Sequence, residues 1–285
     1  MSESLRDIKN RIRSIENTKK ITNAMQMVSM QKLDRVDRAL YIARPYFKEV
    51  LTLLDNLLGG REGLGLPCLK PGSGENSILL LVIASDNGLC GVYNNNIISL
   101  AEDFIKTKAG QSGVRLIVLG SRGVSYFKKK GANIIKDYTL INGRYSDALA
   151  GKISRDLSDE FLNGRAREVY IAYTLYKTGA IHQPVIEKYL NIEPRQGEEI
   201  DFILEPDING ILEKLIPVYL FLKIKLVLLE AFTSEHAARS IAMKYATENA
   251  FEMLEGLVLL RNKVRQANIT KDILEIISSA EALKA

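Results

Sequence analysis

The sequence contains no tryptophan, two histidines, two cysteines and seven prolines among its 285 residues. Two histidines cannot build a histidine-rich metal site. Cys68 and Cys90 lie far apart in different contexts, which suits a reducing compartment better than a disulfide scaffold. No apolar run reaches the ~18 residues of a membrane-spanning helix; the nearest candidate, 218–229, is broken by Lys223 and Lys225. We therefore expect neither a metal site nor a membrane span.

The N-terminal residues and the charge balance further limit where the protein could be located and what it could bind. The first residues, MSESLRDIKNRIRS, lack the apolar stretch of a signal peptide, so we expect a chain that is soluble or peripheral to a membrane. Lys and Arg exceed Asp and Glu by five, which hints at an acidic partner without requiring nucleic acid. Because the two signs are interleaved along the helical stretches, a solvated helix surface is the simpler interpretation.

Both ends of the chain carry apolar residues at helical spacing. From Met243, alternate steps of three and four residues meet Ala246, Ala250, Met253, Leu257, Leu260, Val264 and Ala267. In the N-terminal part the same steps meet Leu5, Ile8, Ile12 and Ile15 and, after a gap, Leu33, Val36, Leu40, Ala43, Phe47, Val50, Leu54 and Leu57. Such stripes seat one long helix against another, so we expect the two ends to pair as a coiled coil.

The N-terminal helix should begin at a cap on Ser2 or Ser4, and it should end after Leu58 at two glycines. Pro45 should bend this helix or mark a local break.

The gap in the N-terminal stripe lies between Lys19 and Ser29, where the seam positions turn polar. Apolar residues, Met25 among them, spread around the helix there instead. Two interpretations stay open. The segment could pack against more than one helix, with methionines filling gaps, or it could form a surface that adapts to several partners in turn.

The middle of the chain has another pattern. Residues 59–76 are a linker rich in glycine and proline. Strand and helix patterns then alternate, which predicts an open α/β sheet with right-handed crossovers. The predicted strands are 77–84, 114–120, 132–139, 168–177 and 184–192, and the predicted helices are 95–108, a short one up to 130, and 147–162. We divide the chain into an N-terminal coiled-coil helix (1–58), the linker (59–76), an α/β domain (77–206) and a C-terminal coiled-coil helix (207–285).

The α/β domain has no recognisable catalytic or nucleotide-binding motif. The turn SDNGLCG at 85–91 lacks the third glycine of a dinucleotide fingerprint. Gly151 and Lys152 do not stand in a phosphate loop. Asp86 and Cys90 could form a polar dyad, but a structural turn at the strand end is the simpler interpretation. We therefore expect no catalytic residues, no cofactor and no metal.

Polar residues of the C-terminal helix are candidates for partner contacts. Glu235 and Arg239 are four apart and can pair across a turn, whereas His236 falls on the seam, where such residues are usually packed. Arg265 and Gln266 lie beside the apolar stripe. Their donor and acceptor groups suit a partner's carboxylate and backbone, although an ordinary helix surface explains them as well.

Several segments together resemble the gamma subunit of F-type ATP synthase. They are KITNAMQMVSMQKL (20–33), SDNGLCG (85–91), SEHAARSIAM (234–243), ATENA (246–250) and NKVRQANIT (262–270). They occur in the order of that family and span nearly the whole chain. The resemblance implies an antiparallel coiled coil of long N- and C-terminal helices with an inserted Rossmann-like open α/β domain.

The resemblance also implies a function. The chain would be a non-catalytic central shaft that rotates within alternating alpha and beta subunits and couples transmembrane ion flow to ATP synthesis or hydrolysis. Its implied partners are the alpha, beta, epsilon and delta subunits and the membrane c-ring, with no nucleic acid and no cofactor. Because the chain lacks a transit peptide and a redox insertion with paired cysteines, we expect it on the cytoplasmic face of a bacterial inner membrane.

Individual residues receive roles from the resemblance. Met25 corresponds to the methionine that faces the lever of the beta subunit, and Arg265 with Gln266 to the pair that contacts a beta loop. Glu235, Arg239 and Thr270 fall on positions tied to coupling, and Asp272 stands where the family usually has Glu. The chain departs from the family pattern at Asn87, Val92, Asp272 and Ser279, among other positions.

Two other classes stay open. A non-rotary coiled-coil scaffold or assembly protein would tolerate an unbroken seam, which the N-terminal helix lacks. An α/β enzyme with helical arms would need a catalytic constellation, which the sequence does not offer.

Overall fold

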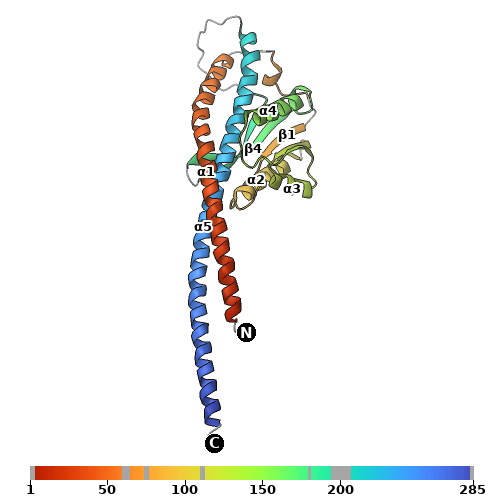
Figure 1. Ribbon diagram of the computed structural model, residues 1–285. Coiled ribbons are helices and arrows are strands. Elements are labelled where there is room, and N and C mark those ends of the chain that lie inside the picture. The colour runs from red at the N-terminus through yellow and green to blue at the C-terminus, as the bar shows by residue number, and fades with distance from the viewer. Residues whose placement is uncertain are drawn as a thin grey trace. The chain divides into compact units, whose positions relative to one another are not determined.

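The computed structural model describes residues 4–59, 65–73, 77–109, 113–178, 181–193 and 207–282. The chain divides into two compact units, one made of residues 1–28 and 240–285 and the other of residues 29–239. Two long helices, α1 (Leu5–Leu58) and α5 (Ile208–Ala282), contribute residues to both units (Figure 1). The sequence-based domain division stays a prediction, and parts of its linker and its boundary at 206 lie outside the described residues.

Helix α1 begins as its sequence predicts. The backbone N–H of Asp7 donates to Ser4 Oγ at 3.2 Å, and the Ser4 hydroxyl donates to the Asp7 carboxylate at 2.7 Å, whereas Ser2 lies outside the described residues. Pro45 does not break the helix, which continues to Leu58. The missing backbone bond at a proline costs about 3 kcal/mol, and burial of apolar side chains on the following turns, such as Phe47 and Val50, offsets it.

In the first unit the two helices pair as an antiparallel coiled coil. Ile8 and Ile12 of α1 are buried in one cluster with Leu257 of α5. Further along α1, Thr22 meets Thr247, whose hydroxyl lies 2.8 Å away. The partner's number falls as the α1 number rises, so the helices run in opposite directions, and Figure 1 shows these parts (red and blue) side by side. The coiled-coil prediction is confirmed.

Between Met243 and Leu260 the predicted seam of α5 is wrong at two positions. Met243, Ala250 and Leu257 are buried as expected, but Met253 is 53 % and Leu260 38 % exposed. The half-buried positions in their place are 254 and 261, Leu and Arg. Steps of four then three residues have the same mean period as steps of three then four. In a stretch as apolar as LEGLVLL, hydrophobicity alone cannot tell the two phases apart.

The second unit contains a five-stranded sheet in the order β3-β2-β1-β4-β5. Its strands are β1 (Ser77–Ile83), β2 (Gly113–Leu119), β3 (Ile134–Tyr138), β4 (Glu168–Thr178) and β5 (Ile181–Leu190). Neighbouring strands are parallel except β5, which pairs with β4 in antiparallel orientation. The connecting helices are α2 (Tyr93–Ala109), α3 (Ser121–Lys129) and α4 (Asp147–Leu162), and a short turn η1 spans Pro67–Leu69. This is the predicted Rossmann-like open α/β sheet.

Strand β1 is buried on both faces, as a continuous apolar run should be. Leu79 and Leu81 point into a core that includes residues of α4 and both long helices. Leu80 and Val82 point into a second core with residues of α2 and α3. The sheet thus lies between two layers of helices. The two loops that follow β1 and β3 meet at its carboxyl edge, where Asp86 accepts from the backbone N–H groups of Leu140 and Asn142.

Within the part of the chain that the structure describes, no helix combines the length and apolarity needed to cross a membrane.

Candidate partner-binding and coupling site

The last part of α5 is a helix with an uncovered apolar face. Every described side chain from Arg265 to Ala280 is exposed. The large apolar side chains among them are Ile269, Ile273, Leu274, Ile276 and Ile277. At about 100° per residue these five cover close to half of the helix circumference. Exposed apolar surface of this kind marks an interaction site, and we call these five residues the apolar face of the α5 end.

The predicted contact residues lie on or beside this face. By helical spacing Gln266 and Thr270 fall within it, and Arg265 and Asp272 lie along one edge. All four are exposed. The Thr270 hydroxyl donates to the Gln266 carbonyl at 3.0 Å, a bond within the helix, and the side chain is still exposed. The arrangement offers an apolar surface with polar groups at its start and along one edge.

Met25 is half-buried in a segment whose other apolar side chains are exposed. Ile21, Met27 and Val28 all project into solvent, whereas the polar seam residue Thr22 is buried. The seam is therefore closed by polar contacts of the coiled coil, and the apolar residues face outward. In the described residues, this exposure favours a surface that adapts to several partners over a segment that packs against more than one helix.

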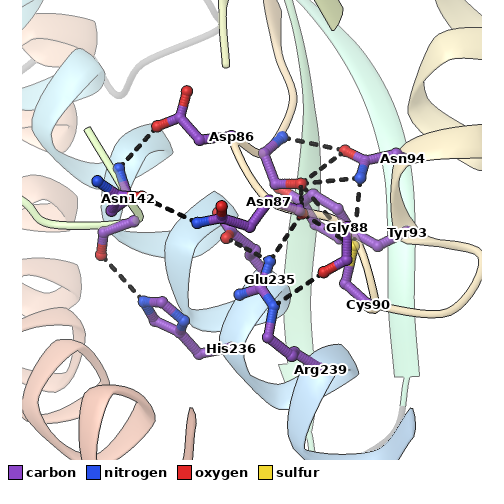
Figure 2. A network of polar contacts seen from close by, with 12 residues as sticks. Asp86, Asn87, Gly88, Cys90, Tyr93, Asn94, Asn142, Glu235, His236 and Arg239 are labelled. Atoms are coloured by element: carbon purple, nitrogen blue, oxygen red, sulfur yellow. Dashed lines mark hydrogen bonds and ion pairs between the residues drawn. The ribbon is translucent and has the colours of Figure 1, made fainter. Parts of the chain in front are cut away.

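Glu235 and Arg239 are buried inside the second unit. They are 1 % and 7 % exposed, and Arg239 Nη2 lies 2.8 Å from a carboxylate oxygen of Glu235. Arg239 also donates to the carbonyls of Asn87, at 3.0 Å, and Gly88, at 3.3 Å. Figure 2 shows the pair aimed at the loop that follows β1. Their burial leaves these two side chains little surface for a partner, so we revise the interpretation that they bind one directly.

Among the described residues, the Glu235 carboxylate bonds to Arg239 alone. Burial raises its pKa, and the charge of Arg239 opposes that rise. Its second oxygen, Oε2, is buried and finds no hydrogen-bond partner in the part of the chain that the structure describes. Removing Arg239 would leave a buried carboxylate uncompensated, which is the costly way to break such a pair.

The Asp86 carboxylate connects the loop after β1, to which it belongs, with the loop after β3 and with the start of α3. Its carboxylate accepts from the backbone N–H and the hydroxyl of Ser121 at the start of α3, both at 2.9 Å. It also accepts from the backbone N–H groups of Leu140, at 3.1 Å, and Asn142, at 2.7 Å. Partial burial acts to raise the pKa of Asp86, but these hydrogen bonds outweigh it and hold the pKa below its ordinary value.

Asp86 does not form a dyad with Cys90. The thiol is buried, and its neighbours are Asn94 Nδ2 at 3.2 Å and Ser85 Oγ at 3.8 Å. SDNGLCG is thus a structural turn, as the simpler interpretation held.

The loop between β3 and α4 is the part of the network that the sequence did not reveal. Asn87 Nδ2 donates to Asn142 Oδ1 at 2.8 Å. Lys32 of α1 donates to the Asn142 carbonyl at 3.3 Å, and His236 Nε2 of α5 lies 3.0 Å from the Gly143 carbonyl. The one signal in the sequence was the Asn-Gly pair itself, which favours a left-handed turn but does not say what binds it.

His236 acts as a neutral donor. It is buried, and because a carbonyl only accepts, Nε2 carries the proton that faces Gly143. Nδ1 then has no proton, and it has no hydrogen-bond partner among the described residues. Burial lowers the pKa of His236 to about 4, so the ring stays uncharged at neutral pH. This matches the expectation of a packed seam residue.

No group of three or more His, Cys, Asp or Glu side chains able to hold a metal ion occurs in the described ranges.

The chain matches known proteins over nearly its whole length. The family model described as ATP synthase matches residues 4–283. The ATP synthase gamma chain of Chlorobium phaeobacteroides is 37 % identical over 291 residues, and that of Protochlamydia amoebophila is 37 % identical over 285 residues; both alignments cover 99 % of this chain and 99 % of the relative. The gamma chain of Chloroherpeton thalassium is 35 % identical over 300 residues, covering 99 % of this chain and 98 % of the relative.

Solved structures support the fold. A chain of the Euglena gracilis mitochondrial ATP synthase, in the OSCP/F1/c-ring structure, superposes with a TM-score of 0.69 at 15 % identity and covers 98 % of this chain and 94 % of that one. A chain of the central stalk and c-ring of the Tetrahymena thermophila enzyme gives a TM-score of 0.60 at 19 % identity, covering 79 % of this chain and 99 % of that one. The family model and the gamma chain relatives both span almost every residue, and the chain therefore belongs to the ATP synthase gamma chain family.

Proposed function

We propose that this chain is the central-stalk subunit of a rotary ATP synthase. In this role it turns within alternating alpha and beta subunits and couples transmembrane ion flow to ATP synthesis or hydrolysis. Similarity to chains in structures titled as the central stalk and the rotor of mitochondrial ATP synthases supports the proposal. The observation that carries it is the exposed apolar face of the α5 end.

The mechanism we propose rests on unequal contacts. A surrounding ring of subunits would enclose the α5 end, whose apolar side chains occupy only part of the circumference. Turning the helix then offers each subunit a different surface in turn. A subunit's open and closed states shift only by the difference in contact free energy that each surface gives them. Rotation is thereby converted into ordered nucleotide binding and release.

Within this mechanism the predicted residues fall into two groups. Arg265, Gln266, Thr270 and Asp272 would contact a partner directly, and so would Met25 with its exposed apolar neighbours. Glu235 and Arg239 would act from inside the chain, by holding the loop at 85–91. This division follows from their exposure and burial.

Catalysis would belong to the beta subunits, and this chain would be non-catalytic. Its further partners would be the alpha, epsilon and delta subunits and the c-ring. We place it at the cytoplasmic face of a bacterial inner membrane, peripheral to the bilayer, because the gamma chain relatives reported above are bacterial. A non-rotary scaffold is not favoured by membership of this family.

The experiment is reconstitution of the full chain with purified alpha and beta subunits, followed by an ATP hydrolysis assay. The double variant Arg265→Ala/Gln266→Ala should assemble and fold as the wild type does, because both side chains are exposed. Its turnover should fall roughly tenfold, the factor that accompanies the loss of a hydrogen bond to a charged group. The exposed Lys263→Ala variant, one turn before on the same helix, should keep wild-type turnover. Equal turnover in the double variant would remove both residues from the contact site.

A further inference from the structure

We infer that the loop of residues 139–143 is the joint that fixes the position of the α/β sheet against both long helices. Lys32 and His236 are then positioning residues for coupling. We call these five residues the joint loop. The inference rests on the proposed function, because it concerns how turning of the helices is passed to the domain.

The joint loop has a backbone that needs outside support. Leu140, Asn142 and Gly143 have φ values of 63°, 54° and 63°. Left-handed conformations cost a leucine or asparagine free energy, and such residues persist only where surrounding contacts hold them. Asp86 supplies part of that support by accepting from two backbone N–H groups of the loop.

Further support comes from the long helices, with one bond from each. Lys32 on α1 donates to the Asn142 carbonyl, and His236 on α5 donates to the next carbonyl, that of Gly143. The fit at α5 is close, because a Cβ on Gly143 would lie 2.6 Å from the His236 ring. Two neighbouring backbone carbonyls are therefore bound by side chains of two helices that are far apart in sequence.

The same loop is tied to the sheet. Asp86 and Asn87 follow β1, and Asp86 also binds Ser121 at the start of α3. A displacement of α1 or α5 against the sheet would thus stretch bonds that converge on this loop. Figure 2 shows Asp86, Asn87 and His236 around Asn142.

Directional bonds matter here because the remaining contacts are mostly apolar. The core shared by the long helices and the sheet is a hydrophobic cluster, and hydrophobic contacts are non-directional. Other directional bonds also join the long helices to the domain. Arg44 and Ser234 donate to carbonyls of β4, at Tyr176 and Thr174, and Arg239 donates to the carbonyls of Asn87 and Gly88. The hydroxyls of Tyr93 and Tyr189 donate to carbonyls of α5, and Lys223 and Lys225 of α5 pair with Glu187 and Asp147. The bonds to β4, β5 and α4 end on regular elements, whereas the joint loop is held by side chains from the loop after β1 and from both long helices.

The test uses four variants of the full chain. His236→Leu and Lys32→Met each remove one donor. His236→Gln is the conservative variant, because its amide N–H can replace Nε2–H. Lys48→Met is the matched control, since Lys48 is exposed on the same helix as Lys32. Lys32 is only half-buried, so its variant should fold even where His236→Leu does not.

Two quantities are measured. Hydrogen exchange of the amides of Leu140 and Asn142 reports on the joint loop in the full chain. It should speed up five- to tenfold in Lys32→Met and His236→Leu, the factor for one lost hydrogen bond. In membranes carrying the whole complex, the membrane potential built per ATP hydrolysed should fall about as much, while ATP hydrolysis itself is kept. His236→Gln and Lys48→Met should match the wild type in both measurements.

The outcomes separate the two proposals. Unchanged exchange in Lys32→Met and His236→Leu would overturn the joint. Faster exchange with an unchanged potential per ATP would also overturn it, because the loop would then be released without consequence for coupling. Failure of the wild-type chain to support any ATP hydrolysis with alpha and beta subunits would instead refute the proposed function, and it would leave the exchange result standing.

Discussion

At the scale of single residues, two buried side chains of α5 bind backbone carbonyls of the loops that follow β1 and β3: Arg239 binds those of Asn87 and Gly88, and His236 binds that of Gly143. Glu235 and Arg239 were expected to pair, and they do, at 2.8 Å. The carbonyls to which Arg239 donates, those that follow β1, lie about 150 residues away in the chain, and no local pattern encodes a contact over such a separation. The sequence also did not predict that both side chains are buried, because a helix with this much apolar surface can be buried on any side. Arg265 and Gln266 were expected at the surface and are exposed.

Gly143 offers a sharp test of the joint loop. Gly143→Ala should lower the free energy of unfolding by roughly 2–4 kcal/mol, because alanine disfavours the left-handed backbone and its Cβ would overlap the His236 ring. Urea denaturation measures the loss. Gly113→Ala is the control: a Cβ there meets nothing within 4 Å, so its stability should stay within about 0.5 kcal/mol of the wild type. A tolerated Gly143→Ala would mean that the ring and the loop are not in contact.

His236 gives a pH-dependent prediction. The unfolded ring binds a proton below its ordinary pKa of about 6.5, whereas the folded ring stays neutral down to about 4. The unfolded state therefore binds more protons in this window, and stability falls as the pH falls through it. Between pH 6.5 and pH 4 the loss should amount to about 3 kcal/mol more in the wild type than in His236→Gln. Parallel pH profiles of the two proteins, measured by urea denaturation, would show that the ring is not buried in neutral form.

At the scale of elements, the sequence was most informative where apolar residues were sparse. The α1 stripe stands out among charged neighbours, and Ile8, Val36, Leu40 and Leu54 are all buried as expected. In α5 apolar residues crowd together, and the seam was placed one residue early at Met253 and Leu260. The parallel strands and their helices were located because apolar runs of strand length alternate with helical patterns. The antiparallel pairing of β5 with β4 was not predicted, because apolar periodicity locates strands but gives neither their order nor their direction in the sheet.

The corrected seam can be tested with two neighbouring residues. Leu254→Ala should destabilise the coiled coil by roughly 1–2 kcal/mol, because a half-buried leucine loses much of its contact area. Met253→Ala, at a position that is 53 % exposed, should change stability by no more than about 0.5 kcal/mol. Thermal unfolding of the full chain measures both. The opposite ranking would restore the seam that the sequence predicted.

At the scale of the whole molecule, family membership and the fold of each unit agree. The Rossmann-like sheet carries loops at its carboxyl edge, where α/β proteins usually bind ligands. Here that edge is filled by side chains of the chain itself, Lys32, His236 and Arg239 among them. The edge thus fastens the domain to two helices. The exposed α5 end, by contrast, leaves apolar side chains for other subunits to cover.

The central claim is that this chain turns. The most direct measurement attaches a visible probe to the full chain in an assembly with immobilised alpha and beta subunits and records its orientation during ATP hydrolysis. The account predicts continued rotation in one direction that stops when ATP is removed. Steady ATP hydrolysis beneath a probe that keeps a fixed orientation would contradict it.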